Sequence, residues 1–274
     1  MSDATSNSHL NPAPDSGLGS GRPQPATVSW RLQPLTALRA LRSLLRDKED
    51  TGQVFQIMRA LNGKAAARGY VRLLNTPKGG AMAYRAEELA PLLDDDAAMA
   101  AMPAGSLGAV YFAWRRKEGL SAAGLAEVAR SALGQQEPLI AHPYAWFGRR
   151  TRDVHDLWHV LNGYGRDGLG EASLVAFSFA QTGGLGWGLI AVGAAIQGLL
   201  RGAPDSVDAI FEGWRRGRRA AWLLGEDYRA LLAEPLESAR QRLNLTQPVR
   251  YQAVLARLAA LGLDPDGAPA LATA

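Results

Sequence analysis

The chain has 274 residues, 47% of them hydrophobic, so it is long enough to bury a substantial core in one large domain or two small ones. Its 30 Lys and Arg residues exceed its 26 Asp and Glu residues by only 4, which gives little support for nucleic-acid binding. The chain has no cysteine, which excludes disulfides, thiol nucleophiles and Cys-ligated metals. Any bound metal must therefore use His and carboxylate ligands.

Residues 1–28 are rich in Ser, Pro, Gly and Asn and lack hydrophobic periodicity. This composition predicts a disordered tail, because it offers too little apolar surface to offset the entropy of ordering. The segment has no apolar core of a secretory signal, and its Asp and Pro content argues against an Arg-rich mitochondrial presequence. We therefore expect a cytoplasmic protein.

Beyond the tail, apolar residues recur at spacings of three and four, which predicts an all-α fold with a single multi-helix domain over 29–246. A C-terminal helix and a loose tail are expected over 247–274. There is no internal repeat and no convincing β-alternation. The expected helices lie within residues 35–50, 51–63, 64–75, 107–116, 121–132, 143–162, 170–200, 204–224, 226–233 and 248–262.

Residues 172–200 form a stretch of 29 residues without a charge, long enough to span a bilayer. The stretch also contains Gln181, Thr182 and the run GGLGWG, so a buried central helix, kinked or broken at Gly183 and Gly184, is favoured over a transmembrane one. Gly184 and Gly188 would allow a neighbouring backbone to approach closely. A third interpretation is a pocket-lining helix that accepts a lipid tail.

The segment RDVHDLWHVLNGYG carries two of the four histidines of the chain. At about 100° per residue, His159 lies near 40° and Asp156 near 100° from His155, so the three share one facet of a helix. Imidazole and carboxylate groups suit zinc or iron, and histidines four apart can converge on one ion. The ordinary alternative is a solvated helix face. We expect the helix to pack through its opposite, apolar side, which is formed by Val154, Leu157, Trp158, Val160 and Leu161.

Glu171 opens the next expected helix after the Gly-rich connector NGYGRDGLG, and a short reversal would return it to the same facet. Its alternative role is a favourable charge at a helix N-terminus. Asp167 lies within the connector and could be a cap or a fifth oxygen ligand; because loops commonly carry Asp for turn reasons, it is left out of the ligand set. Arg152, on the facet of the histidines, could orient a carboxylate or form a plain salt bridge. His142 is a weak candidate for a third imidazole.

The run RRGRR at 215–219 is basic and lies within an expected helix. It could meet anionic lipid headgroups, but a solvated helix face is the favoured interpretation.

Taken together, these residues resemble the ubiquinone biosynthesis family known as coenzyme Q biosynthesis protein 4. The hallmark of that family is HDxxH followed by eleven residues and Glu, which here is met by His155, Asp156, His159 and Glu171. The similarity covers roughly residues 30 to 245. It also includes the segments DTGQVFQIMRALNG, GRRTRDVHDLWHVLNGYGRDGLGEASLVAFSFAQTGGLGW and EGWRRGRRAAWLLGEDY.

The resemblance implies that the four motif residues hold a divalent cation, with zinc favoured and iron, manganese or cobalt as alternatives. Asp156 and Glu171 are the candidate catalytic carboxylates, and which of them stays on the metal and which moves protons is left open. The implied reaction is oxidative decarboxylation at ring carbon 1 of a polyprenylated 4-hydroxybenzoate-derived precursor, where a carboxyl is replaced by hydroxyl.

The implied partners are the polyprenylated aromatic precursor, other quinone biosynthesis enzymes and a membrane surface, with the protein peripheral on the inner face of the cytoplasmic membrane. A homodimer is also considered, and no nucleic-acid partner is expected. Two other functions compete. A metal phosphohydrolase of the HD type would need a suitably placed upstream His, for which only His142 is available. A lipid-binding scaffold would hold quinone intermediates and recruit enzymes without catalysis.

Overall fold

The computed structural model describes residues 31–47, 50–132 and 143–268, and within these ranges the protein is all-α, with helices and no β-strand. The predicted fold class is thereby confirmed. The predicted tail at 1–28 and His142 lie outside the described residues.

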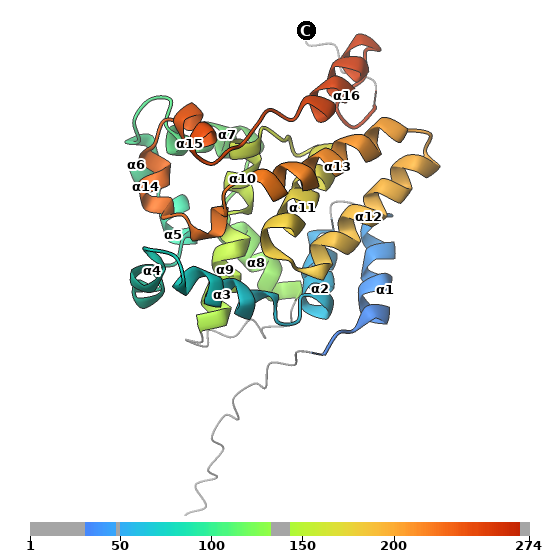
Figure 1. Ribbon diagram of the computed structural model, residues 1–274. Coiled ribbons are helices and arrows are strands. Elements are labelled where there is room, and N and C mark those ends of the chain that lie inside the picture. The colour runs from blue at the N-terminus through green and yellow to red at the C-terminus, as the bar shows by residue number, and fades with distance from the viewer. Residues whose placement is uncertain (1–30, 48–49, 133–142, 269–274) are drawn as a thin grey trace, which may run out of the picture.

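Figure 1 shows how the helices follow one another along the chain. They are α1 (Pro34–Leu44), α2 (Thr51–Leu61), α3 (Ala65–Leu74), α4 (Gly79–Arg85), α5 (Ala90–Leu93), α6 (Asp96–Ala100), α7 (Leu107–Glu118), α8 (Ala122–Ala132), α9 (Pro143–Asp153), α10 (His155–Asn162), α11 (Gly168–Thr182), α12 (Leu185–Leu200), α13 (Pro204–Arg219), a 3-10 helix (Leu223–Gly225), α14 (Tyr228–Ala233), α15 (Leu236–Arg242) and α16 (Val249–Ala260).

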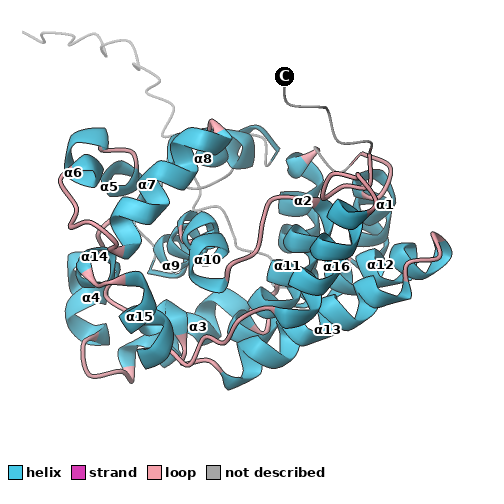
Figure 2. Ribbon diagram, turned by 90° about the horizontal axis from the view of Figure 1, so that it is seen from above, coloured by secondary structure: helices cyan, strands magenta, loops and turns pink. Residues whose placement is uncertain are grey.

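Helix α11 is the buried central helix of the fold, because it is apolar on nearly all sides. Leu174 and Phe177 belong to the larger apolar cluster, which is built with α7, α9, α10 and the helices after α13. Val175 and Ala176 belong to the second cluster, formed with α1, α2 and α12. In Figure 2, α11 lies between these two groups of helices. The expectation of a buried central helix is correct for the first half of the uncharged stretch.

The predicted break at Gly183 and Gly184 is confirmed. Helix α11 ends at Thr182, Gly183 adopts a φ of +64°, which favours glycine, and α12 begins at Leu185. No helix within the described ranges combines the length and apolarity needed to cross a bilayer. The close approach to a neighbouring backbone is at Gly186, where a Cβ would lie 3.1 Å from Cα of Met58.

Two predicted helix bounds were wrong. The segment 143–162 is two helices, α9 and α10, which meet at Val154; this residue is fully buried, so the pattern of apolar residues continues through the break and hides it. The segment 204–224 stops being α-helical at Arg219. There the side chain of Gln181 donates to the carbonyls of Gly217 and Ala221 and accepts from the amide of Leu223, so contacts from α11 replace helical hydrogen bonds.

Four helices had not been predicted: α4, α5, α6 and α15. They have 7, 4, 5 and 7 residues, which is two turns or fewer. Segments this short do not repeat an apolar face often enough to reveal a period of 3.6.

The basic run 215–219 is only partly a solvated face. Arg216 is buried, and its guanidinium donates to the carbonyl oxygens of Asn162, at 3.0 Å, and Thr246 while lying 5.0 Å from the ring centroid of Tyr164. Arg215, Arg218 and Arg219 are exposed, as predicted. Arg216, the buried residue of the run, therefore connects α13 to the C-terminus of α10 by a hydrogen bond.

We expect Gly213→Ala to destabilise the protein, because a Cβ at Gly213 would lie 2.3 Å from the carbonyl oxygen of Ser173, where α13 crosses α11. Overpacking of this kind costs about 1–3 kcal/mol. The matched control is Gly148→Ala in α9, where a Cβ meets nothing within 4 Å. The control is expected to leave the free energy of unfolding unchanged or raise it by up to about 1 kcal/mol. Urea unfolding compares the two, and equal stability would show that the α11–α13 contact can relax.

Candidate metal centre

A tight reversal joins α10 to α11 and places the motif residues against one another. The carboxylate of Asp167 accepts from the amide of Gly170 at 3.0 Å and from the hydroxyl of Tyr251, which in turn accepts from the amide of Gly165 at 2.9 Å. A Cβ at Gly170 would lie 2.2 Å from the carbonyl oxygen of Gly165, so only glycine fits there. Asp167 is thus the N-cap of α11, one of the two roles that the sequence left open, and Glu171 lies in the first turn.

The C-terminus of α10 is held by two arginines from other helices. Arg240 of α15 donates to the carbonyls of Val160, at 2.8 Å, and Leu161, at 3.0 Å. Arg216 of α13 donates to that of Asn162. Cationic donors satisfy the free carbonyls at this end and complement the helix dipole. The helix that carries the motif is therefore anchored at its C-terminus by two other parts of the chain.

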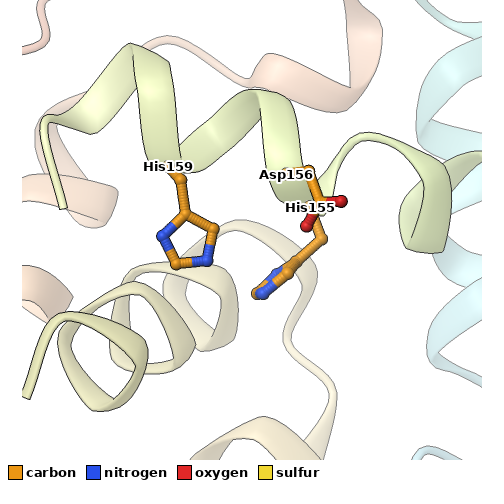
Figure 3. Close-up of side chains that lie close together, drawn as sticks. All are labelled: His155, Asp156 and His159. Atoms are coloured by element: carbon orange, nitrogen blue, oxygen red, sulfur yellow. The ribbon is translucent and has the colours of Figure 1, made fainter. Parts of the chain in front are cut away.

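The structure brings the four motif residues together. One ligand atom from each of His155, Asp156 and His159 lies within 4.8 Å of the others. Figure 3 shows these three side chains extending from α10, with the two imidazoles on the same side of the helix. The carboxylate of Glu171 reaches them from α11, with Oε1 lying 3.3 Å from Nε2 of His159 and Oε2 lying 3.5 Å from Nε2 of His155.

The five residues predicted to pack on the opposite arc of α10 are all buried, which confirms that prediction. The facet of the histidines is not a solvated face, however. His159 is only 1% exposed, while His155 and Asp156 are partly exposed.

Neighbouring groups fix the orientation of both imidazoles. Nδ1 of His159 lies 3.2 Å from the carbonyl oxygen of Tyr164, an arrangement that favours a proton on Nδ1 and leaves Nε2 as a lone-pair donor. Trp114 stacks on His159 with ring centroids 5.6 Å apart, and Trp187 stacks on His155 at 5.8 Å. Nε2 of His159 is buried and faces Oε1 of Glu171 at 3.3 Å, whereas Nδ1 of His155 is buried without a hydrogen-bond partner.

The charges of His159 and Glu171 are coupled. Burial would raise the pKa of Glu171, but the adjacent imidazoles outweigh it and hold that pKa below its usual range. Burial would lower the pKa of His159, but the carboxylate of Glu171 outweighs it and raises that pKa. In the metal-free protein the pair therefore stabilises the fold over an intermediate pH window. This contribution is lost as the pH falls through the lowered pKa of Glu171 or rises through the raised pKa of His159.

The remaining sequence candidates have structural roles or lie at the edge of the site. Arg152 forms a salt bridge with Asp153, with its Nη2 2.8 Å from Oδ1. Of the two roles expected from the sequence, this is the salt bridge and not the orientation of a carboxylate. Arg166, which no motif indicated, places Nε 4.0 Å from Oε1 of Glu171. Trp114 and Trp187 had not been predicted either, because their helices are distant in sequence and no local spacing links them to the histidines.

A large open cavity of about 1950 Å³ adjoins the motif. His155, Asp156 and Glu171 line it at one side, whereas His159 is not among the lining residues. Apolar side chains from α1, α2, α8 and α12 form much of the remaining wall, including Leu44, Val54, Met58, Val128 and Ile190. This volume exceeds the roughly 300–1,000 Å³ of ordinary ligand pockets. The cavity can therefore accept a long apolar molecule with its polar end at the histidines.

The residues present fit a divalent cation. Two imidazoles and two carboxylates form an N/O donor set without cysteine, and Nε2 of each imidazole faces the carboxylate of Glu171, at 3.3 and 3.5 Å. Partial exposure of His155 and Asp156 to the cavity would leave room for a substrate group beside the ion.

We expect Glu171→Gln to lower the pKa of His159 in metal-free protein, because the carboxylate that offsets burial is removed. An NMR titration of the imidazole signals measures this shift. The matched control is Glu234→Gln, since Glu234 pairs with Arg242 instead. An unchanged pKa for His159 in both variants would contradict the coupling.

The family model for "Coenzyme Q (ubiquinone) biosynthesis protein Coq4" matches residues 70–249. A Danio rerio protein named "Ubiquinone biosynthesis protein COQ4 homolog, mitochondrial" is 29% identical over 182 residues, covering 65% of this chain and 63% of the relative. The Bos taurus protein of the same name is 31% identical over 109 residues, or 38% of this chain and 40% of the relative. The chain thus spans less than two thirds of these curated relatives.

A crystal structure of a candidate ubiquinone biosynthesis protein from Nostoc punctiforme shares the fold, with a TM-score of 0.57 and 21% sequence identity. It covers 79% of this chain and 100% of its own. The matched range of the family model includes the whole HDxxH motif and Glu171. The chain therefore belongs to the Coq4 family, whose members are involved in ubiquinone biosynthesis.

Proposed function

We propose that this protein catalyses a metal-dependent oxidative decarboxylation at ring carbon 1 of a polyprenylated 4-hydroxybenzoate-derived precursor. The observation that carries the proposal is the cluster of His155, Asp156, His159 and Glu171 at the wall of a large cavity with apolar sides. Such a cavity suits a substrate with one polar aromatic end and a long apolar tail. The family membership supports the pathway but leaves the reaction itself to be tested.

The reaction breaks the bond between the ring carbon and the carboxyl group, which leaves as carbon dioxide, and attaches a hydroxyl oxygen to the same carbon. With water as the oxygen source, two electrons and two protons are released, so an electron acceptor or dioxygen is required. A bound divalent cation would supply Lewis acidity for a substrate carboxylate, or a site for oxygen chemistry if it is iron. Zinc is favoured, and iron, manganese and cobalt are the alternatives.

The protein groups have separate roles in this proposal. His155 and His159 would hold the cation, and the carbonyl of Tyr164 keeps Nε2 of His159 free to do so. Asp156 and Glu171 would complete the ligand set, and one of them could move a proton at a carboxylate oxygen. Although burial would raise the pKa of Glu171, the imidazoles hold that pKa below its usual range and keep its carboxylate ionised.

The apolar wall would hold the prenyl tail. Val54 and Met58 of α2, Val175 of α11 and Ile190 of α12 contribute to it. Each Å² of apolar surface removed from water stabilises binding by roughly 25 cal/mol. The tail would thereby position the aromatic ring without any charged contact along its length.

We expect His159→Ala to abolish bound metal and to lower the quinone content of cells that depend on this protein. Loss of a ligand should weaken metal affinity by more than the roughly tenfold to hundredfold effect of changing a supporting residue. Elemental analysis of protein purified without added metal and quinone extraction measure the two effects. His9→Ala, in the segment predicted to be a tail, is the matched control. Unchanged metal and quinone in His159→Ala would refute the proposal.

The alternative is a non-catalytic scaffold that holds quinone intermediates and organises other enzymes. The size of the cavity favours it as much as it favours catalysis. Purified metal-loaded protein should release carbon dioxide from a prenylated ring acid when an oxidant is supplied, if it is the enzyme. Co-purification of quinone pathway enzymes together with no release of carbon dioxide would favour the scaffold instead.

A further inference from the structure

Arg166 lies in the connector between α10 and α11 and belongs to the wall of the large cavity, as three of the four motif residues do. Its side chain is exposed, and its one ion pair within the described ranges is to Glu171, with Nε 4.0 Å from Oε1. That distance is too long for a hydrogen bond. The N–H donors of the guanidinium are therefore available to an acceptor that enters the cavity.

The backbone on either side of Arg166 is held in place. The amide of Gly165 donates to the hydroxyl of Tyr251 at 2.9 Å, and that hydroxyl donates to the carboxylate of Asp167. Tyr251 is buried, and the carboxylate of Asp167 also caps α11, so this acid is already engaged with partners other than Arg166. The connector therefore presents the guanidinium from a fixed place beside the motif.

Two other arginines that line the same cavity already have partners. Arg152 forms its salt bridge with Asp153. Arg68 of α3 donates to the carbonyl of Gly183 at 3.4 Å, where α11 ends. Of these three arginines, Arg166 is the one that lies beside a carboxylate of the motif and donates no hydrogen bond to a described residue.

We propose that Arg166 binds the carboxylate of an aromatic acid substrate and thereby makes the cavity prefer the acid to the corresponding phenol. A planar guanidinium can donate two parallel hydrogen bonds to one carboxylate. When Glu171 serves as a metal ligand, the cation offsets its negative charge, and its attraction for Arg166 weakens. The substrate carboxylate then becomes the partner of Arg166. This inference rests on the proposed function, because the ligand is the carboxyl group that the proposed reaction removes.

The affinities of two matched ligands test the proposal without any turnover. The probes are a geranylated 4-hydroxybenzoate and the geranylphenol that lacks only its carboxyl group, and calorimetry measures their binding to the metal-loaded full chain. We expect Arg166→Gln to weaken binding of the acid by roughly tenfold to hundredfold, the effect of losing a hydrogen bond between charged groups. Binding of the phenol should stay unchanged, because the phenol has no carboxylate for the guanidinium.

The matched control is Arg201→Gln. Arg201 is an exposed arginine at the C-cap of α12 that lines the same cavity. Its replacement changes the charge of the cavity wall by the same amount but away from the connector, so both affinities should stay unchanged. Both variants alter exposed side chains, and they should therefore keep the unfolding midpoint of the wild-type protein.

Three results would overturn the proposal. The first is an unchanged affinity of Arg166→Gln for the acid, and the second is an equal loss in Arg201→Gln, which would show that any positive charge suffices. The third is a loss of bound metal from Arg166→Gln by elemental analysis, which would mean that Arg166 acts by holding Glu171. If Arg166→Gln loses the acid as expected but the wild-type protein releases no carbon dioxide from it, the proposed function fails and the binding role stands.

Discussion

The close passage of the backbone at Gly170 over the carbonyl of Gly165 is the constraint on which the metal centre depends. It allows the chain to reverse between α10 and α11 within a few residues, and Asp167 and Tyr251 lock the reversal with hydrogen bonds. Glu171 consequently faces the imidazoles of α10 from the first turn of α11. A wider loop would separate the carboxylate from the histidines, although the sequence of the motif would be unchanged.

Buried polar side chains hold the surrounding helices in place. Arg240 and Arg216 donate hydrogen bonds to the terminal carbonyls of α10. The side chain of Gln181 forms hydrogen bonds with backbone groups where α13 ends. Each contact joins segments far apart in sequence and gives a hydrogen-bond partner to backbone groups at a helix end. Within the site, Trp114 and Trp187 stack on the two histidines, and these ring contacts also join segments distant in sequence. The ligand geometry is thus a property of the whole helical assembly and not of the motif alone.

Helix α12 links the site to the outer surface. One face of it packs on α11 and α2 and places Trp187 against His155, while another lines the cavity and a third is exposed. A helix that is apolar all round would ordinarily be buried. In α12, by contrast, Leu185, Val192, Ile196 and Leu199 are each at least half exposed.

The amino-acid sequence by itself determined the helical class, the packing arc of α10 and the break at Gly183, because each depends on the pattern along a few turns. It also placed His155, Asp156 and His159 on one facet, whereas Glu171 joined the candidate site through the family resemblance. A cap was one of two roles that the sequence left open for Asp167, and the structure shows that it is the N-cap of α11. Tertiary structure alone decided the break at Val154, the end of α13 at Arg219 and the burial of Arg216. It also brought Arg166, Trp114 and Trp187 to the site. These features depend on hydrogen bonds and ring contacts between distant segments, which leave no periodic pattern in the sequence.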